Sequence, residues 1–170
     1  MENKQTLRKK YKEIRNNLDV NSKSIELCKK LRETEVYKSS NNIMTFYPLT
    51  NEIDTRDLFN DFKNFYLPKT DGENLLVCPY KTNDKMELSS FHTLEPISEP
   101  ILPEKLDLVI VPALVVDKNN YRLGYGKGFY DRFISQNPQL KTVVLIPKEL
   151  VIEELPIDEF DKQVDFVISD

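Results

Sequence analysis

Residues 106–132 read LDLVIVPALVVDKNNYRLGYGKGFYDR, and this stretch decides the fold that the sequence predicts. Leu106 to Val116 is the most apolar segment of the chain and is typical of a buried central strand. A turn over Asp117 to Asn120 and a glycine-rich loop follow it. Phe129 to Gln136 then predicts a short helix that Asn137 and Pro138 end.

The loop contains three of the chain's four glycines, at Gly124, Gly126 and Gly128. Glycine takes positive φ without steric penalty and lets a ligand touch the backbone. Successive amides in such a loop attract an anion, the start of a helix at Phe129 adds a positive dipole end, and Lys127 adds a full charge. We therefore interpret the loop as a phosphate site, although it matches neither Walker A nor GxGxxG. A tight strand-to-helix turn without a ligand is the alternative.

Length and composition indicate one domain over residues 1–170. The chain is long enough to bury a core without disulfides or metal, with 39% hydrophobic and 31% charged residues. No apolar run approaches the roughly 18 residues that cross a bilayer, and no secretory signal is visible. We therefore expect a cytoplasmic protein with no membrane partner.

The net charge, the two cysteines and the single histidine limit the possible partners and metal sites. The formal net charge is −4 and no basic stripe is interleaved with aromatics, which argues against a nucleic-acid partner. Cys28 and Cys78 are isolated, so reduced thiols are expected. The single histidine, His92, cannot build a histidine metal site and is expected at the surface. A metal would be held by carboxylates, which favours Mg²⁺.

Helix and strand patterns alternate along the first half of the chain. Helices are predicted at residues 2–18, at 22–37 and after a cap at Asp54 or Thr55, and strands at 43–47, 65–68 and 75–80. The first helix carries an apolar stripe, with Lys4 and Arg8 on a neighbouring face. Glu52 is placed between the end of a strand and the start of a helix, where open α/β sheets bind ligands.

The second half continues the alternation. Residues 86–91 are predicted to pair with 75–80 as a hairpin, and 94–103 to form a crossing loop. Further strands are expected at 142–146 and 164–168, joined by an irregular acidic connection over 149–159. The order of elements argues for an α/β sandwich over a mainly parallel sheet.

Three segments together resemble the 5-formyltetrahydrofolate cyclo-ligase family, also called methenyltetrahydrofolate synthetase. Lys4-Gln-Thr-Leu-Arg8 is similar to the family's N-terminal KxxLR, and Tyr47 with Glu52-Ile-Asp-Thr55 is similar to its substrate segment. Asp107 to Arg132 is similar to its D-L-(I/V)-x-x-P…R-L-G-x-G-x-G-(Y/F)-Y-D-R signature, the most specific of the three. The match covers most of the chain.

This resemblance implies a three-layer α/β/α sandwich with a mostly parallel central sheet. It also implies an enzyme that uses ATP and Mg²⁺ to convert 5-formyltetrahydrofolate to 5,10-methenyltetrahydrofolate. The implied ATP-binding residues are Lys4, Arg8, Arg122, Leu123, Gly124, Gly126, Lys127, Gly128, Phe129 and Tyr130, with Lys127 and Arg122 also catalytic. The implied folate-binding residues are Tyr47, Glu52, Tyr125, Lys127 and Phe129, and the implied Mg²⁺ ligands are Asp131 and Asp165.

Other functions stay open from the residues alone. A sugar-phosphate isomerase of a related fold would also cradle phosphate but would need no ATP. A non-catalytic nucleotide- or folate-binding module would bind the ligands and release no ADP. The expected partners are the two small-molecule substrates, and a monomer is expected.

Overall fold

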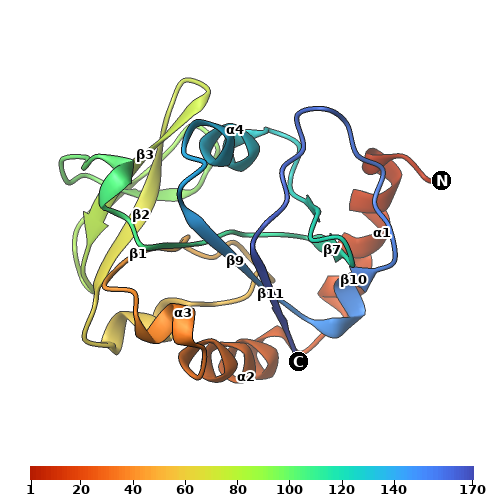
Figure 1. Ribbon diagram of the computed structural model, residues 1–170, viewed down its shortest axis with the longest axis horizontal. Helices are drawn as coiled ribbons and strands as arrows, with labels where there is room; N and C mark the ends of the chain where they lie inside the picture. Colours follow the sequence, from red (N-terminus) through yellow and green to blue (C-terminus); the bar gives the residue numbers. More distant parts are fainter.

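A six-stranded sheet forms the centre of the computed structural model, which describes all residues, 1–170 (Figure 1). Its strands are β1 (Asn42–Met44), β2 (Asn64–Asp71), β3 (Asn74–Tyr80), β6 (Leu108–Ile110), β9 (Lys141–Ile146) and β11 (Phe166–Ser169). They lie in the order β11-β9-β6-β1-β2-β3. All neighbours are parallel except β2 and β3, which form an antiparallel hairpin. The predicted mostly parallel sheet is confirmed.

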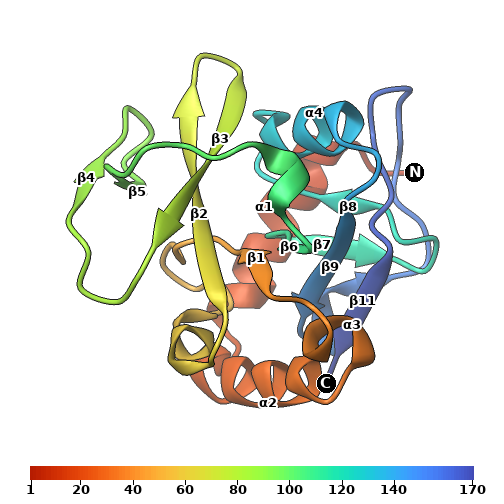
Figure 2. The same ribbon diagram turned by 60° about the vertical axis from the view of Figure 1, so that its left-hand side comes forward.

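Helices cover both faces of this sheet (Figures 1 and 2). The helices α2 (Val20–Arg32) and α3 (Glu35–Lys38) lie on one face, and α1 (Lys4–Asn16) and α4 (Phe129–Gln136) on the other. Successive strand residues point to opposite faces, so Ile43 packs in a core with Leu27 of α2, whereas Met44 packs in a core with Phe133 of α4. The predicted three-layer sandwich is confirmed. None of the helices has the length and apolar character that a bilayer span requires.

Smaller elements surround the main sheet. A three-stranded sheet contains β7 (Val115–Asp117), β8 (Arg122–Leu123) and β10 (Val151–Ile152), and a two-stranded arm contains β4 (Met86–Leu88) and β5 (Leu94–Pro96). Three short 3₁₀ helices are η1 (Arg56–Asn60), η2 (Pro103–Lys105) and η3 (Lys148–Leu150). Leu7 of α1 packs against Leu114 and Leu123 beside the small sheet. The small sheet thereby fixes where the glycine loop begins.

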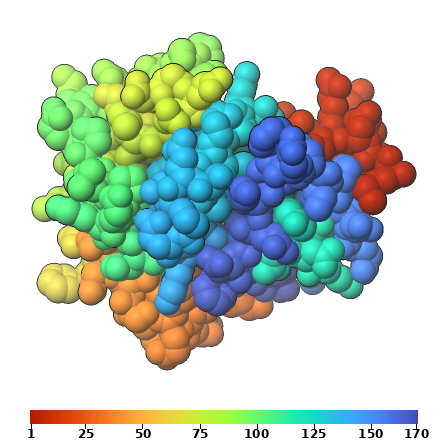
Figure 3. Space-filling view, turned by 45° about the horizontal axis from the view of Figure 1, so that its top comes forward, coloured from red at the N-terminus to blue at the C-terminus, as the bar shows by residue number.

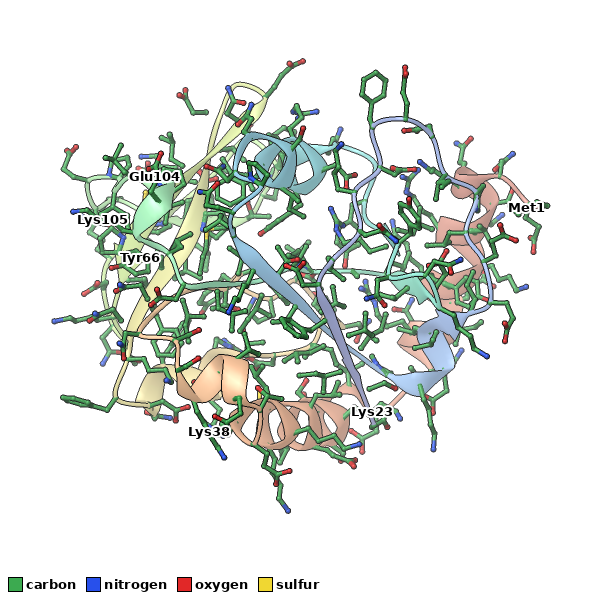
Figure 4. All side chains as sticks on the ribbon, in the orientation of Figure 1. Met1, Lys23, Lys38, Tyr66, Glu104 and Lys105 are labelled. Atoms are coloured by element: carbon green, nitrogen blue, oxygen red, sulfur yellow. The ribbon has the colours of Figure 1, made fainter.

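The end of the main sheet is fixed by an ion pair. The ammonium of Lys23 on α2 lies 2.6 Å from a carboxylate oxygen of Asp170, the last residue. Figure 4 labels Lys23 beside the end of β11. It also lies 3.0 Å from Glu149. These contacts hold the end of β11 against α2, away from the glycine loop.

The predicted single strand over Leu106 to Val116 is wrong in one respect. It divides into β6 in the main sheet and β7 in the small sheet, and Pro112 lies between them. Proline has no backbone N–H for a ladder and is therefore poorly tolerated inside a central strand. This division moves the chain out of the main sheet just before the glycine loop.

The predicted helix over residues 22–37 is two helices. The first, α2, begins before residue 22, because the side chain of Asp19 caps it, and it ends at Arg32. The hydroxyl of Thr34 accepts a hydrogen bond from the amide of Tyr37 and so starts α3 as a new helix. Ile25 lies on the outer side of α2, with 74% of its surface exposed.

Two further local predictions are wrong. The helix expected after Thr55 is only the 3₁₀ turn η1, and Phe62 beyond it is fully exposed. The segment 86–91 does not pair with β3, because β4 pairs with β5 across a tight turn closed by Ser89 and Thr93. The region expected to be a crossing loop therefore begins with a strand.

Candidate active site

One cavity of about 1110 Å³ opens among the segments that the sequence singled out. Its walls are the glycine loop, the start of α1, the β2–β3 hairpin, the turn between β4 and β5, and residues 158–162. In Figure 3, the hairpin, α4 and the C-terminal segment lie next to one another on one face. Residues distant in sequence thus share one site.

The glycine loop has the backbone that an anion site needs. Gly126 has φ 94° and Gly128 has φ 73°, both in the left-handed region that favours glycine. Gly128 also occupies the N-cap position of α4, where no side chain accepts a hydrogen bond from the first turn. The free N–H groups at the start of α4 are therefore available to a negatively charged ligand.

A guanidinium group lies where each loop glycine would carry a side chain. A β-carbon on Gly124 would lie 2.6 Å from Nη1 of Arg122, and one on Gly126 would lie 3.3 Å from the Cζ of Arg8. The third such pair is Gly128 with Arg132, where the distance to Nη1 would be 2.6 Å. The glycines therefore let three arginines pack against the loop as well as leaving its backbone open.

The two basic residues of α1 both line the cavity but have different partners. Arg8 donates through Nε to the carbonyl of Gly124 at 2.9 Å. Lys4 donates to Asp161 at 2.5 Å and to Asp158 at 3.1 Å. Although partial burial lowers the pKa of Lys4, the bonds to these aspartates raise it above the usual value overall. Lys4 would have to exchange these partners to bind a phosphate.

The two predicted catalytic cations lie at different depths. The side chain of Arg122 is 5% exposed, its Nη1 donates to the carbonyl of Pro112 at 3.2 Å, and its Nε has no partner. Burial lowers the pKa of this guanidinium. Lys127 is exposed, and its ammonium lies 5.5 Å from the centre of the Phe91 ring with no carboxylate partner. Lys127 is thus free to meet an incoming phosphate, and Arg122 lies beneath the loop.

Aromatic side chains line the cavity beside the glycine loop and form what we call the aromatic wall: Phe91, Phe129 and Tyr130. Phe129 contacts Phe91 edge to face, with 5.5 Å between the ring centres. Tyr130 lies 5.5 Å from the guanidinium of Arg122, and burial raises the pKa of its hydroxyl. Leu123, by contrast, is a core residue with 2% exposure, so it can meet a ligand only through its backbone. The aromatic wall suits a flat ring.

Glu52 is a buried carboxylate in the cavity wall, with 8% exposure. One oxygen accepts from the amide of Leu49 at 2.6 Å and the other from the hydroxyl of Tyr125 at 3.0 Å. Burial raises the pKa of Glu52, and these two hydrogen bonds act in the opposite direction. Tyr47, also in the wall, accepts from Arg56 at 3.3 Å.

The two predicted metal ligands are not in the same place. Asp131 lines the cavity, 3.8 Å from Arg122, and accepts from the amide of Lys162. Asp165 is not among the lining residues, and its carboxylate accepts from the amide and hydroxyl of Thr142 at 2.9 and 3.2 Å. It fixes the starts of β9 and β11, and no group of three or more potential metal ligands forms.

Several residues of the wall were not singled out by the sequence. The turn between β4 and β5 brings Phe91 and His92 to the cavity, and Glu95 is buried there with a bond of 2.7 Å from the amide of Thr70. His92 is exposed, as expected, but it lies at the cavity. No local pattern marks Phe91 or Glu95 as site residues, since residues 86–91 were predicted to pair with 75–80 and residues 94–103 to form a crossing loop.

Fold and cavity together are typical of an α/β enzyme that acts on a phosphorylated ligand beside a flat ring. The glycine loop, the start of α4 and Lys127 supply the anion-binding part. The aromatic wall and Glu52 supply the part that would bind a flat ring. The class of protein follows from both parts lying in one cavity.

The comparisons with known proteins identify the family. The model of the 5-formyltetrahydrofolate cyclo-ligase family matches residues 1–170, and the chain belongs to this family. The predicted family and the prediction of a ligase are thereby confirmed.

Relatives are similar over most of their lengths. A probable 5-formyltetrahydrofolate cyclo-ligase of Schizosaccharomyces pombe is 27% identical over 88% of this chain and 85% of its own. The enzyme of that name from Haemophilus influenzae is 31% identical over 73% of each chain. The solved structure of Aquifex aeolicus 5,10-methenyltetrahydrofolate synthetase is 29% identical with a TM-score of 0.86, covering 98% of this chain and 89% of that one. These likenesses extend through both halves of the fold.

Proposed function

We propose that this protein catalyses the ATP-dependent cyclisation of 5-formyltetrahydrofolate to 5,10-methenyltetrahydrofolate, with release of ADP and phosphate. The observation that carries the proposal is the family match over residues 1–170. The cavity supports it, because a phosphate loop and an aromatic wall with a buried carboxylate face the same space of about 1110 Å³. ATP as co-substrate is implied by the family.

The first step needs no nucleophile from the protein. N5 of the substrate is an amide nitrogen whose lone pair enriches the formyl oxygen, and that oxygen attacks the γ-phosphorus as ADP leaves. The protein aligns the two substrates and neutralises charge that spreads over the phosphoryl oxygens. Lys127 and the N–H groups of the loop and of α4 would meet this charge directly, with Arg122 beneath them.

The second step closes the ring. N10 attacks the activated formyl carbon, the phosphate leaves with the former formyl oxygen, and N10 loses its proton. Glu52 would orient the folate, because a fixed carboxylate accepts hydrogen bonds from ring N–H groups. Tyr47, Tyr125 and Phe129 would line the ring pocket.

We also propose that Mg²⁺ accompanies ATP at this site. Mg²⁺ is commonly held by one or two carboxylates together with substrate phosphates, and the Asp131 carboxylate at the cavity fits that requirement. When bound, the ion would neutralise phosphate charge. Asp165 would have to release Thr142 to take part.

Asp131→Asn should raise the Mg²⁺ concentration needed for half-maximal activity, because the amide keeps the shape and loses the charge. A Mg²⁺ titration of initial rates at saturating ATP measures this. Asp165→Asn serves as the comparison, since Asp165 is bonded to Thr142 outside the cavity. An unchanged titration for Asp131→Asn would remove Asp131 from the metal site.

The function itself is tested by the near-ultraviolet absorbance of the methenyl product. The signal should rise when 5-formyltetrahydrofolate, ATP and Mg²⁺ are mixed with the protein, and each omission should abolish it. Folate-dependent release of ADP separates this enzyme from an isomerase and from a binding module. We also propose that the protein is a cytoplasmic monomer, and gel filtration tests the oligomeric state.

A further inference from the structure

Three polar side chains form a hydrogen-bonded chain that runs from behind the cavity into its wall. Nη1 of Arg15 lies 2.7 Å from the hydroxyl of Tyr125, and that hydroxyl lies 3.0 Å from Oε2 of Glu52. They come from three separate parts of the protein: α1, the glycine loop and the loop after β1. The Tyr125 hydroxyl accepts a hydrogen bond from Arg15 and donates one to Glu52. Both hydrogen bonds therefore run from Arg15 toward Glu52.

Arg15 is buried without a carboxylate in direct contact. It is 8% exposed, its Nε has no hydrogen-bond partner, and no ion pair includes it. A buried charge without a compensating partner destabilises a fold. The nearest compensation is the Glu52 carboxylate, reached through Tyr125.

Arg15 cannot touch a ligand in the main cavity. It does not line that cavity, but it shares with Glu52 the lining of a separate void of about 10 Å³. A void of this size holds at most one water molecule. Any effect of Arg15 on a substrate must therefore act through Tyr125 and Glu52.

Helix α1 contacts two consecutive residues of the glycine loop from one face. Arg8 and Arg15 are seven residues apart, close to two helical turns. Arg8 bonds to the carbonyl of Gly124, and Arg15 bonds to the side chain of Tyr125. The same helix thus supports the loop backbone and orients the one loop side chain that reaches Glu52.

We infer that Arg15 is a positioning residue, which holds the Tyr125 hydroxyl so that Glu52 presents its carboxylate to the folate ring in a fixed orientation. The inference rests on the proposed function, because it assigns Glu52 to the folate. Leu49 and Tyr125 each occupy one site on the carboxylate. A carboxylate has about four acceptor sites, so roughly two remain for N–H donors of the ligand.

The charge on Glu52 depends on these neighbours. Burial raises the pKa of its carboxyl, while the Leu49 amide, the Tyr125 hydroxyl and the Arg15 charge lower it. Tyr130 of α4 also faces Glu52, and burial together with the Glu52 charge raises the pKa of the Tyr130 hydroxyl. Loss of Arg15 or of the Tyr125 hydroxyl removes a group that lowers the pKa of Glu52, so this pKa should rise. Glu52 should then take up a proton at higher pH, and the acidic limb of kcat/KM for folate should move to higher pH.

The test compares Tyr125→Phe, Arg15→Met and Arg15→Lys with the wild type. In Tyr125→Phe and Arg15→Met, the KM for 5-formyltetrahydrofolate should rise about tenfold, as for one lost hydrogen bond to a charged group. The KM for ATP should stay within about twofold, and the acidic limb should shift to higher pH. Arg15→Lys keeps the charge and should recover part of both effects. Lys9→Met, which removes an exposed charge from the same helix, is the control.

Several outcomes would overturn the inference. One is an unchanged folate KM and an unchanged pH profile in Tyr125→Phe. This variant loses only the hydroxyl and keeps the ring, so it is expected to fold even if Arg15→Met does not. Another is an equal rise of the KM for folate and the KM for ATP with an unchanged pH profile. That result would mean that Arg15, Tyr125 and Glu52 only support the structure of the site. A wild type that forms no methenyl product would instead overturn the proposed function. Calorimetric affinities for 5-formyltetrahydrofolate in the same variants would then decide the inference separately, with equal affinities counting against it.

Discussion

Turnover should fall by about two to three orders of magnitude when Lys127 is replaced by alanine, by analogy with the loss of one oxyanion donor. Lys127 is exposed in the loop, lies over Phe91 and has no acidic partner, so its charge is available to the phosphoryl group. That charge matters most when negative charge spreads in the transition state. The protein should stay folded, because the side chain packs in no core cluster.

The measurement is kcat at saturating ATP and folate, with melting temperature as the check on folding. Lys85→Ala is the matched control, since Lys85 is exposed before β4 and lines no part of the cavity. A turnover within about threefold of wild type in Lys127→Ala would show that this lysine does not carry the role.

Gly126→Val should abolish detectable ATP binding. Residue 126 has φ 94°, which a β-branched residue adopts only with strain, and its β-carbon would lie 3.3 Å from the guanidinium carbon of Arg8. The branched side chain would therefore displace Arg8 and move the loop amides. The loop is exposed at Gly126, so the rest of the fold should persist.

Calorimetric titration with ATP and Mg²⁺ tests this expectation. The chain offers a matched control in Gly72→Val, because Gly72 also has positive φ, at 62°, but nothing lies within 4 Å of its β-carbon position. Gly72 is in the β2–β3 turn, so its variant should lose some stability and keep its ATP affinity. Normal affinity in Gly126→Val would argue against a phosphate cradle built from this backbone.

The main layers could be predicted because their signals are local. The apolar run at residues 142–146 and the apolar stripe of α1 are both recognisable from residues close together in the sequence. The glycine loop was equally readable, since three glycines around a lysine are rare in a chain with four. The change of sheet at Pro112 was less readable, because the apolar character continues on both sides of the proline.

The site was only partly predictable because its wall is assembled from distant segments. The seven-residue spacing of Arg8 and Arg15 was a usable signal, but nothing in the sequence shows that Arg15 meets Tyr125, 110 positions away. The partners of Lys4 at Asp158 and Asp161 are equally remote. Asp165 shows the opposite case. The family resemblance implied that it binds Mg²⁺, but its carboxylate accepts a hydrogen bond from Thr142 at the start of β9.

The three guanidinium groups seated against the loop glycines have a consequence for handling the protein. Arg122 has the Asp131 carboxylate at 3.8 Å, whereas Arg8 and Arg132 bond only to backbone carbonyls, so the like charges along this short loop are only partly neutralised and repel one another. Inorganic pyrophosphate or tripolyphosphate should therefore raise the melting temperature of the protein before any nucleotide is added, and a storage buffer of low ionic strength should suit it poorly. The attraction of the same three groups for anions would slow the release of ADP and phosphate after each turnover.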